Sequence, residues 1–171
     1  MAESVMISIR PEWAEKIVKR KKTVEVRKNR PKIEVPFKCY IYCTKGKSKD
    51  IWGTVYGGYV IGEFVCDNIR CFDVPYPAFQ NEMDKSILEQ SCLTYYQLHR
   101  YAYHDKLYGW HISDLQIYAK PKKLSDFYVF KKCNSCKDTG YESSACIYDE
   151  DCKVPAVITR PPQSWCYVEE L

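Results

Sequence analysis

Short segments that read as β-strands recur along this chain, and polar or proline-bearing turns separate them. The clearest one, residues 23–27, alternates strictly, so that Val24 and Val26 point to one face of a strand and Glu25 and Arg27 to the other. The other predicted strands are 5–9, 37–44, 59–69, a bent strand or strand pair within 107–119, and 165–168. Five or six strands without a βαβ rhythm predict the α+β class, as a small, mostly antiparallel β-barrel with two or three flanking helices.

Two segments carry helix signals. Pro11 suits a first helical turn, and the apolar residues that follow it fall on one helical face. Thr94 and Gln97 form a capping box, which predicts a second helix that runs to about Tyr101. We expect a single domain over residues 1–171, with inserts at about 70–106 and 129–156.

The basic residues are unevenly distributed. The net charge is only +4, but nine Lys or Arg residues and a single acid lie between Lys16 and Lys32. Such a cluster can neutralise phosphates, although a solvated basic face has the same composition. The 15 Tyr and 4 Trp residues suit either core packing or stacking on unpaired bases.

No apolar run approaches the roughly 20 residues that cross a bilayer, and the first residues lack the apolar core of a signal peptide. We therefore predict a cytoplasmic protein that has no membrane partner. In a reducing compartment, the ten cysteines favour free thiols or a metal site over a disulfide framework.

Three charged residues stand at the junction between the first helix and the strand 23–27. Glu25 and Arg27 share one strand face, and Lys22 directly precedes the strand. A carboxylate beside two cations stays ionised and can accept hydrogen bonds from a base edge. The alternative is a surface ion pair that contributes little to stability.

The octapeptide from Arg20 to Arg27 resembles the signature of the ASCH family, Gly-x-Lys-Thr-x-Glu-x-Arg, which follows a helix. Further segments similar to the family are 8–13, 60–64, 108–112 and 160–165. The resemblance touches most of the chain outside the two inserts. It points to the bacterial and phage branch, whose members are little more than this domain.

The resemblance implies a PUA-like barrel whose cleft binds RNA or a modified nucleoside. One branch of the family hydrolyses N4-acetylcytidine with a Lys and a Thr of the signature, and some members are ribonucleases. Lys22 matches that Lys, whereas Glu25 occupies the position of the Thr nucleophile, and Thr23 is a different position of the motif. Arg20 stands where the signature has Gly, so we expect a different turn geometry there, because Arg adopts positive φ poorly.

Other residues are assigned to the same cleft. Arg10 follows the first strand, Tyr42 offers a stacking platform, and Gln163 can read a base edge or cap a turn. His111 is the natural proton shuttle if the protein is an enzyme, together with Lys22 and Glu25, but a lone His is more often a structural residue.

The insert at about 129–156 carries a candidate metal site. Cys133 and Cys136 supply a chelating pair for tetrahedral zinc, and Cys146 and Cys152 supply a second pair with a longer spacing. We predict a structural zinc, with a disulfide, free thiols or an iron–sulfur cluster as alternatives.

Three functions remain open at this point. The first is an RNA-binding module, and the second is a hydrolase of N4-acetylcytidine-like nucleosides or of RNA. The third is a protein-interaction domain that uses the cysteine insert. The absence of Thr at residue 25 favours the first over the second.

Overall fold

The computed structural model describes residues 4–46, 57–132 and 153–170. The strands are β1 (Ser4–Ile9), β2 (Val24–Arg27), β3 (Phe37–Cys43), β4 (Tyr59–Cys66), β5 (Ile69–Phe72), β6 (Leu107–His111), β7 (Ser113–Lys122), β8 (Phe127–Lys132), β9 (Lys153–Val157) and β10 (Trp165–Glu170). The helices are α1 (Pro11–Val18), α2 (Lys85–Ser91) and α3 (Tyr95–Ala102), and two 3-10 turns are η1 (Pro77–Glu82) and η2 (Leu124–Asp126).

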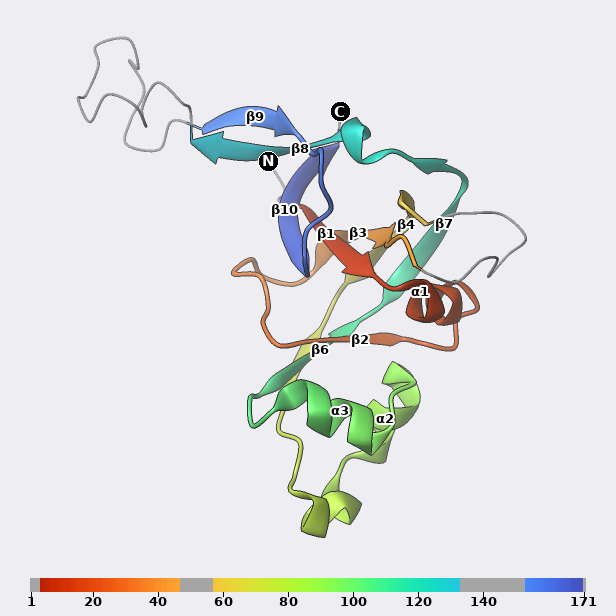
Figure 1. Ribbon diagram of the computed structural model, residues 1–171, viewed down its shortest axis with the longest axis vertical. Helices are drawn as coiled ribbons and strands as arrows, with labels where there is room; N and C mark the ends of the chain where they lie inside the picture. Colours follow the sequence, from red (N-terminus) through yellow and green to blue (C-terminus); the bar gives the residue numbers. More distant parts are fainter. Residues whose placement is uncertain (1–3, 47–56, 133–152, 171) are drawn as a thin grey trace, which may run out of the picture.

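These strands form two sheets (Figure 1). The large sheet has seven strands in the order β7-β4-β3-β1-β10-β8-β9, and the small sheet has three in the order β2-β6-β5. β1 and β3 are parallel, and the other strand pairs are antiparallel. In Figure 1 the small sheet lies between the large sheet and the pair α2–α3.

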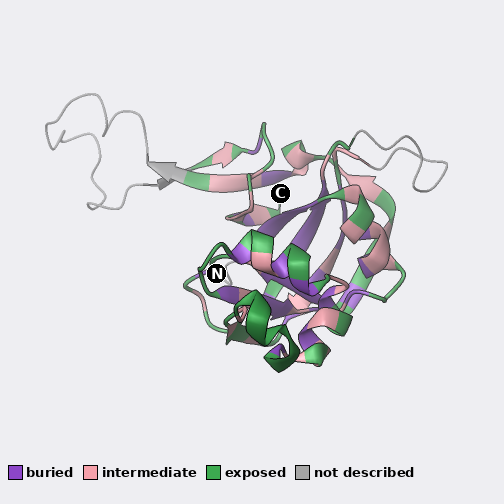
Figure 2. Cartoon of the chain, turned by 60° about the horizontal axis from the view of Figure 1, so that its bottom comes forward, coloured by how far each residue is buried: buried purple, intermediate pink, exposed green. Residues whose placement is uncertain are grey.

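Alternation along β1 places apolar residues on both faces of the large sheet. Val5 and Ile7 pack on one face with Trp110 of the small sheet, whereas Met6 packs on the other with Phe127. All five of these side chains are fully buried, and Figure 2 shows buried residues, in purple, along the central strands. Burial on both faces fixes the register, because a shift by one residue would exchange the two faces.

Trp110 lies on the face of the small sheet that packs against the large sheet. The other face of the small sheet is covered by helices. Val24 and Val26 of β2 pack against Ile87 of α2 and Leu98 of α3. The predicted capping box is present: the Thr94 side chain accepts from the Gln97 N–H, and the Gln97 side chain accepts from the Thr94 N–H. The cap satisfies two backbone donors at the start of α3 and so fixes where that helix begins.

The mixed α+β class is confirmed, with a large sheet and few helices. Within the described ranges the strand pairs close neither sheet into a barrel, so the barrel stays a prediction. None of the helices in these ranges is long and apolar enough to cross a membrane. A cytoplasmic location and a single domain with two inserts remain predictions.

Three segments differ from the predicted elements. Residues 59–69 form not one strand but β4 and the start of β5, with Asp67 and Asn68 between them. The segment 70–106 contains α2 and η1 as well as the predicted α3. β8 and β9 were not predicted, and β9 contains Pro155, which an edge strand tolerates because one side of its backbone needs no ladder donor.

Candidate functional site

The turn after α1 sets the position of Lys22. Arg20 has a φ of +56°, a left-handed conformation that glycine adopts without strain. The chain therefore makes a turn with positive φ at this signature position although the residue is Arg, and the side chain donates to the carbonyl of Leu115 at 3.2 Å. The backbone N–H groups of Lys21 and Lys22 both donate to the carbonyl of Lys16, which closes the turn.

The side chains of Lys22, Glu25 and Arg27 converge, and Glu25 and Arg27 share a strand face, as their spacing predicts. The Lys22 Nζ lies 3.3 Å from Glu25 Oε2, and an Arg27 terminal nitrogen lies 3.1 Å from Glu25 Oε1. We call these three residues the charged cluster. Their side chains are 2%, 8% and 13% exposed, respectively, so the cluster is far more buried than a surface ion pair.

The charged cluster joins three parts of the fold. The Lys22 Nζ donates to the carbonyl of Ser91 at the end of α2, at 2.7 Å. Arg27 donates to the carbonyl of Ser8 on β1, at 2.6 Å. Charge-assisted hydrogen bonds of this kind are stronger than neutral ones. The cluster thus connects the small sheet to the large sheet on one side and to α2 on the other.

Some polar atoms of this region lack hydrogen bonds. Within the described residues, Glu25 Oε2, Arg27 Nε and Trp110 Nε1 are buried without a hydrogen-bond partner. Glu25 and Trp110 are direct partners in the β2–β6 pair, so their side chains leave the sheet on the same face. Buried polar groups in folded proteins are nearly always hydrogen-bonded, which makes this group of three unusual.

The structure does not bring His111 to the charged cluster. His111 pairs with Val24 in the β2–β6 ladder, whereas Glu25 pairs with Trp110, and neighbouring residues on a strand point to opposite faces. His111 therefore lies on the α2 side of the small sheet. Its Nδ1 is 2.6 Å from Asp67 Oδ1, and this hydrogen bond lowers the pKa of the Asp67 carboxyl.

The remaining predicted cleft residues lie in different settings. Tyr42 is buried at 3% exposure among the apolar side chains on the Met6 face of the large sheet, so in this structure its ring is covered. Arg10 is exposed at the start of α1. Gln163 is exposed between Pro162 and Ser164, whose carbonyls accept from the Oγ and the N–H of Ser8. The roles assigned to these residues stay predictions.

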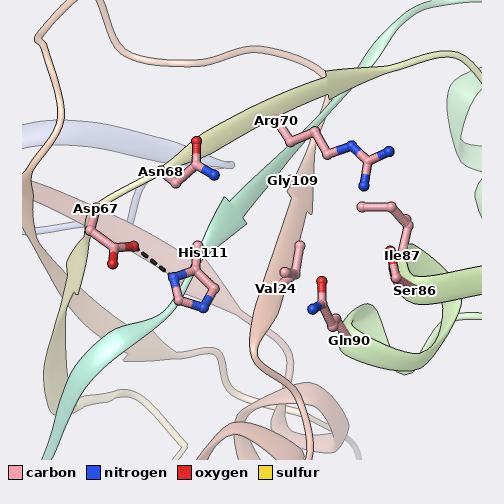
Figure 3. A pocket seen from close by; sticks show the side chains of 9 residues that line it. All are labelled: Val24, Asp67, Asn68, Arg70, Ser86, Ile87, Gln90, Gly109 and His111. Carbon is pink, nitrogen blue, oxygen red and sulfur yellow. Dashed lines mark hydrogen bonds and ion pairs between the residues drawn. The ribbon is translucent and has the colours of Figure 1, made fainter. Parts of the chain in front are cut away.

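A cavity of about 420 Å³ lies between the small sheet and α2 (Figure 3). Nine residues line it: Val24, Asp67, Asn68, Arg70, Ser86, Ile87, Gln90, Gly109 and His111. Apart from His111, the sequence reasoning assigned no role to these residues. The Asp67-Asn68 pair is a common turn signal between strands, and it would have marked one end of the cavity.

The cysteines divide into two groups. Cys133, Cys136, Cys146 and Cys152 lie outside the described residues, so the zinc site stays a prediction, and no other metal-binding group of three or more side chains is found in the described part. The six described cysteines are free thiols, and Cys39, Cys43 and Cys66 are buried in strands. Cys71 differs from them because it is exposed.

Fold and site together define a class of protein: a small α+β domain in which the basic turn after α1 and the short strand β2 carry a buried Lys-Glu-Arg cluster. The model of the ASCH domain family matches residues 7–91, about half of the chain, and includes that strand. The chain belongs to the ASCH domain family, which is generally linked to RNA binding.

Solved structures support the assignment of the fold. The crystal structure of ASCH from Zymomonas mobilis is 22% identical and has a TM-score of 0.60, over 96% of this chain and 86% of that chain. A tyrosine-to-phenylalanine variant of the Zymomonas mobilis protein gives 20% identity and a TM-score of 0.56, over 96% and 88% of the two chains. At these identities the likeness concerns the fold alone. No curated protein matches the chain.

Proposed function

We propose that this protein binds single-stranded RNA or a modified nucleoside of RNA, with the charged cluster of Lys22, Glu25 and Arg27 at the centre of the site. The observation that carries the proposal is a group of three buried atoms that make no hydrogen bond within the described residues, although Glu25 Oε2 lies 3.3 Å from Lys22 Nζ in an ion pair. Glu25 Oε2 is an acceptor and Arg27 Nε and Trp110 Nε1 are donors, all without a hydrogen-bond partner among the described residues. A base edge offers both donors and acceptors and can satisfy such a set.

The charge of the site is consistent with a ligand that carries phosphate. The cluster contains two cations and one carboxylate, and Lys19, Arg20 and Lys21 are exposed at the end of α1 just before it. Phosphate neutralisation by Lys and Arg supplies most of the affinity of non-specific nucleic-acid binding. Arg27 is the least buried member of the cluster, so the ligand approaches from its side.

The proposal is tested by titrating a labelled single-stranded RNA at low and high salt. We expect affinity to fall steeply with salt. In the triple variant, with Lys19, Arg20 and Lys21 changed to Ala, the slope of log affinity against log salt should decrease by the equivalent of up to about three phosphate contacts. Arg27→Ala should weaken binding at both salt concentrations. Thermal melts of each variant establish that it is folded.

Lys38→Ala is the matched control. It also removes one positive charge, but Lys38 lies on β3, where it pairs with Glu63 at 3.0 Å, away from the cluster. The site assignment fails if folded Arg27→Ala and the triple variant bind RNA as the parent does. It also fails if Lys38→Ala weakens binding as much as they do.

A hydrolase is the second candidate, and the pairing of His111 with Asp67 favours it. When the Nδ1–H of His111 donates to the carboxylate, Nε2 is left as a base that takes a proton from water or from a ribose hydroxyl. On N4-acetylcytidine, water would add to the acetyl carbon and the bond to N4 would break, giving cytidine and acetate. The family's Thr route is not assigned here, because residue 25 is Glu.

Chromatography after incubation with N4-acetylcytidine, and separately with RNA, tests this second candidate. Product formation that is lost in His111→Ala and retained in His104→Ala supports it. His104 is an exposed histidine that does not line the cavity. If neither substrate is converted, the hydrolase candidate is rejected and the binding function is untouched.

A further inference from the structure

The cavity between the small sheet and α2 lies on the opposite face of β2 from the charged cluster. Val24 lines it, whereas Glu25, the next residue, points into the cluster. Ligand pockets of proteins typically have volumes of 300–1,000 Å³, and this one is about 420 Å³. It therefore constitutes a separate place for a ligand group to bind.

The floor of the cavity is apolar and is kept open by a glycine. Val24 and Ile87 are 5% and 2% exposed and form part of the lining. A Cβ atom at Gly109 would lie 2.9 Å from Val24 Cγ1, so any other residue would crowd this floor. An apolar floor of this kind suits the face of a flat ring, as in the stacking and packing of unpaired bases.

The charged groups of the rim are already paired with each other. Arg70 is 2.5 Å from Asp84 Oδ2, and Ser86 Oγ donates to Asp84 Oδ1 at 2.7 Å. His111 is paired with Asp67 at 2.6 Å. The lining cation Arg70 and the imidazole of His111 therefore each have a carboxylate partner, which disfavours a phosphate as the group that enters the cavity.

Two amide side chains of the rim remain for recognition. Asn68 and Gln90 are exposed, and both are labelled on the rim in Figure 3. In the described part of the chain, only their backbone carbonyls accept hydrogen bonds from backbone N–H groups: Asn68 accepts from His111 and Gln90 accepts from Thr23, each at 2.9 Å. Their side-chain amides form none with described residues. A side-chain amide presents a donor beside an acceptor, the pattern that pairs with the edge of an uncharged base.

We infer that this cavity takes a single unpaired base of a bound RNA, with the ring on Val24 and Ile87 and its edge on Asn68 and Gln90. The inference rests on the proposed RNA-binding function and deepens it, because it assigns a base pocket distinct from the charged cluster. An RNA that binds both would present its backbone to the cations near the end of α1 and turn one base toward α2.

The test uses the full chain, labelled with ¹⁵N, and the four free ribonucleosides as probes. We expect at least one nucleoside to shift the amide signals of Asn68, Gln90 and their neighbours. Asn68→Ala and Gln90→Ala should each raise its dissociation constant roughly 5- to 150-fold, the range for loss of a bidentate amide–base contact. Gln90→Trp, which fills the cavity from the exposed rim, should abolish the shifts.

Glu89→Ala is the matched control, because Glu89 is exposed on the same helix and does not line the cavity. Its affinity for the nucleoside should equal that of the parent. If RNA binds in the salt-dependent assay but no nucleoside shifts the cavity signals, the inference is overturned and the proposed function stands. If nucleosides bind there and RNA does not bind, RNA binding as the proposed function fails, and with it the assignment of the cavity to a base of a bound RNA. If inorganic phosphate produces the cavity shifts and nucleosides do not, the inference is wrong.

Discussion

Glu25 on β2 and Trp110 on β6 are direct partners across the small sheet, and each holds a buried polar atom without a hydrogen-bond partner in the described residues. Glu25 Oε2 is an acceptor and Trp110 Nε1 is a donor. The two residues therefore place complementary hydrogen-bonding groups on one face of the sheet, next to Arg27. This pairing gives the site a polar interior, which a purely structural salt bridge would not need.

The charged cluster should be essential for stability because its carboxylate balances two buried cations. We expect Glu25→Ala to lower the free energy of unfolding by about 3–5 kcal/mol, the usual effect of removing one partner from a buried ion pair. Lys22→Met should lower it less, because Glu25 then keeps Arg27 at 3.1 Å and the methionine fills most of the space. Urea denaturation measures both, and equal losses would contradict this account.

The left-handed turn at Arg20 should favour glycine. Its φ of +56° strains any residue that has a Cβ atom by roughly 1 kcal/mol. Arg20→Gly and Arg20→Ala both lose the hydrogen bond to Leu115, so the difference between them isolates the backbone effect. We expect Arg20→Gly to be the more stable by about 1 kcal/mol in thermal or urea unfolding. A more stable Arg20→Ala would show that the turn is not strained.

The contact between β4 and β7 should tolerate no side chain at Gly62. A Cβ atom there would lie 2.3 Å from the carbonyl oxygen of Gln116, and backbone atoms cannot move aside as a flexible side chain can. We expect Gly62→Ala to cost at least about 1–3 kcal/mol. Gly57→Ala is the control, since its nearest contact would be 3.3 Å, and it should cost clearly less in the same urea titration.

Thiol reactivity should follow burial. Burial raises the pKa of the Cys66 thiol to about 12 and that of Cys43 to about 11, so few thiolates form at pH 8. Cys71 is exposed on β5. Iodoacetamide followed by peptide mass spectrometry should label Cys71 in the native protein, and Cys43 and Cys66 only after unfolding. Labelling of Cys66 as fast as Cys71 would contradict the structure.

Stability in acid should depend on Asp67. The hydrogen bond from His111 lowers the pKa of this carboxyl in the folded state below its unfolded value of about 3.9. The stabilisation is therefore present above about pH 5 and is lost as the pH falls through the folded pKa. Urea midpoints between pH 3 and 6 should fall less steeply for Asp67→Asn than for the parent.

Asp73→Asn serves as the control for that measurement, because it replaces an exposed carboxylate in the segment after β5. It should retain the acid dependence of the parent. An unchanged profile in Asp67→Asn would mean that the pair with His111 does not couple to folding.

Local patterns were enough to predict the elements near the charged cluster. Pro11 marked the start of α1, Thr94 and Gln97 marked α3, and strict alternation marked β2. The convergence of Glu25 and Arg27 also followed from spacing, because residues two apart on a strand share a face. These features depend on neighbours in the sequence, which a single chain displays directly.

Features that depend on distant contacts were not predictable. The burial of Lys22 requires the carbonyl of Ser91, 69 residues later in the chain. The separation of His111 from Glu25 requires the β2–β6 register, which no local pattern specifies. β9 was missed because Pro155 argues against a strand unless the strand lies at a sheet edge, and the edge position is a property of the whole sheet.

The hydrogen bond from Arg27 to the carbonyl of Ser8 has a consequence for how such a protein diversifies. The same guanidinium holds the small sheet to β1 and faces the proposed ligand. A substitution that alters ligand preference at residue 27 therefore also loosens the junction between the two sheets. New specificity at this position would have to arise in a variant whose stability had first been raised elsewhere, whereas the rim at Asn68 and Gln90 is free to vary without that precondition.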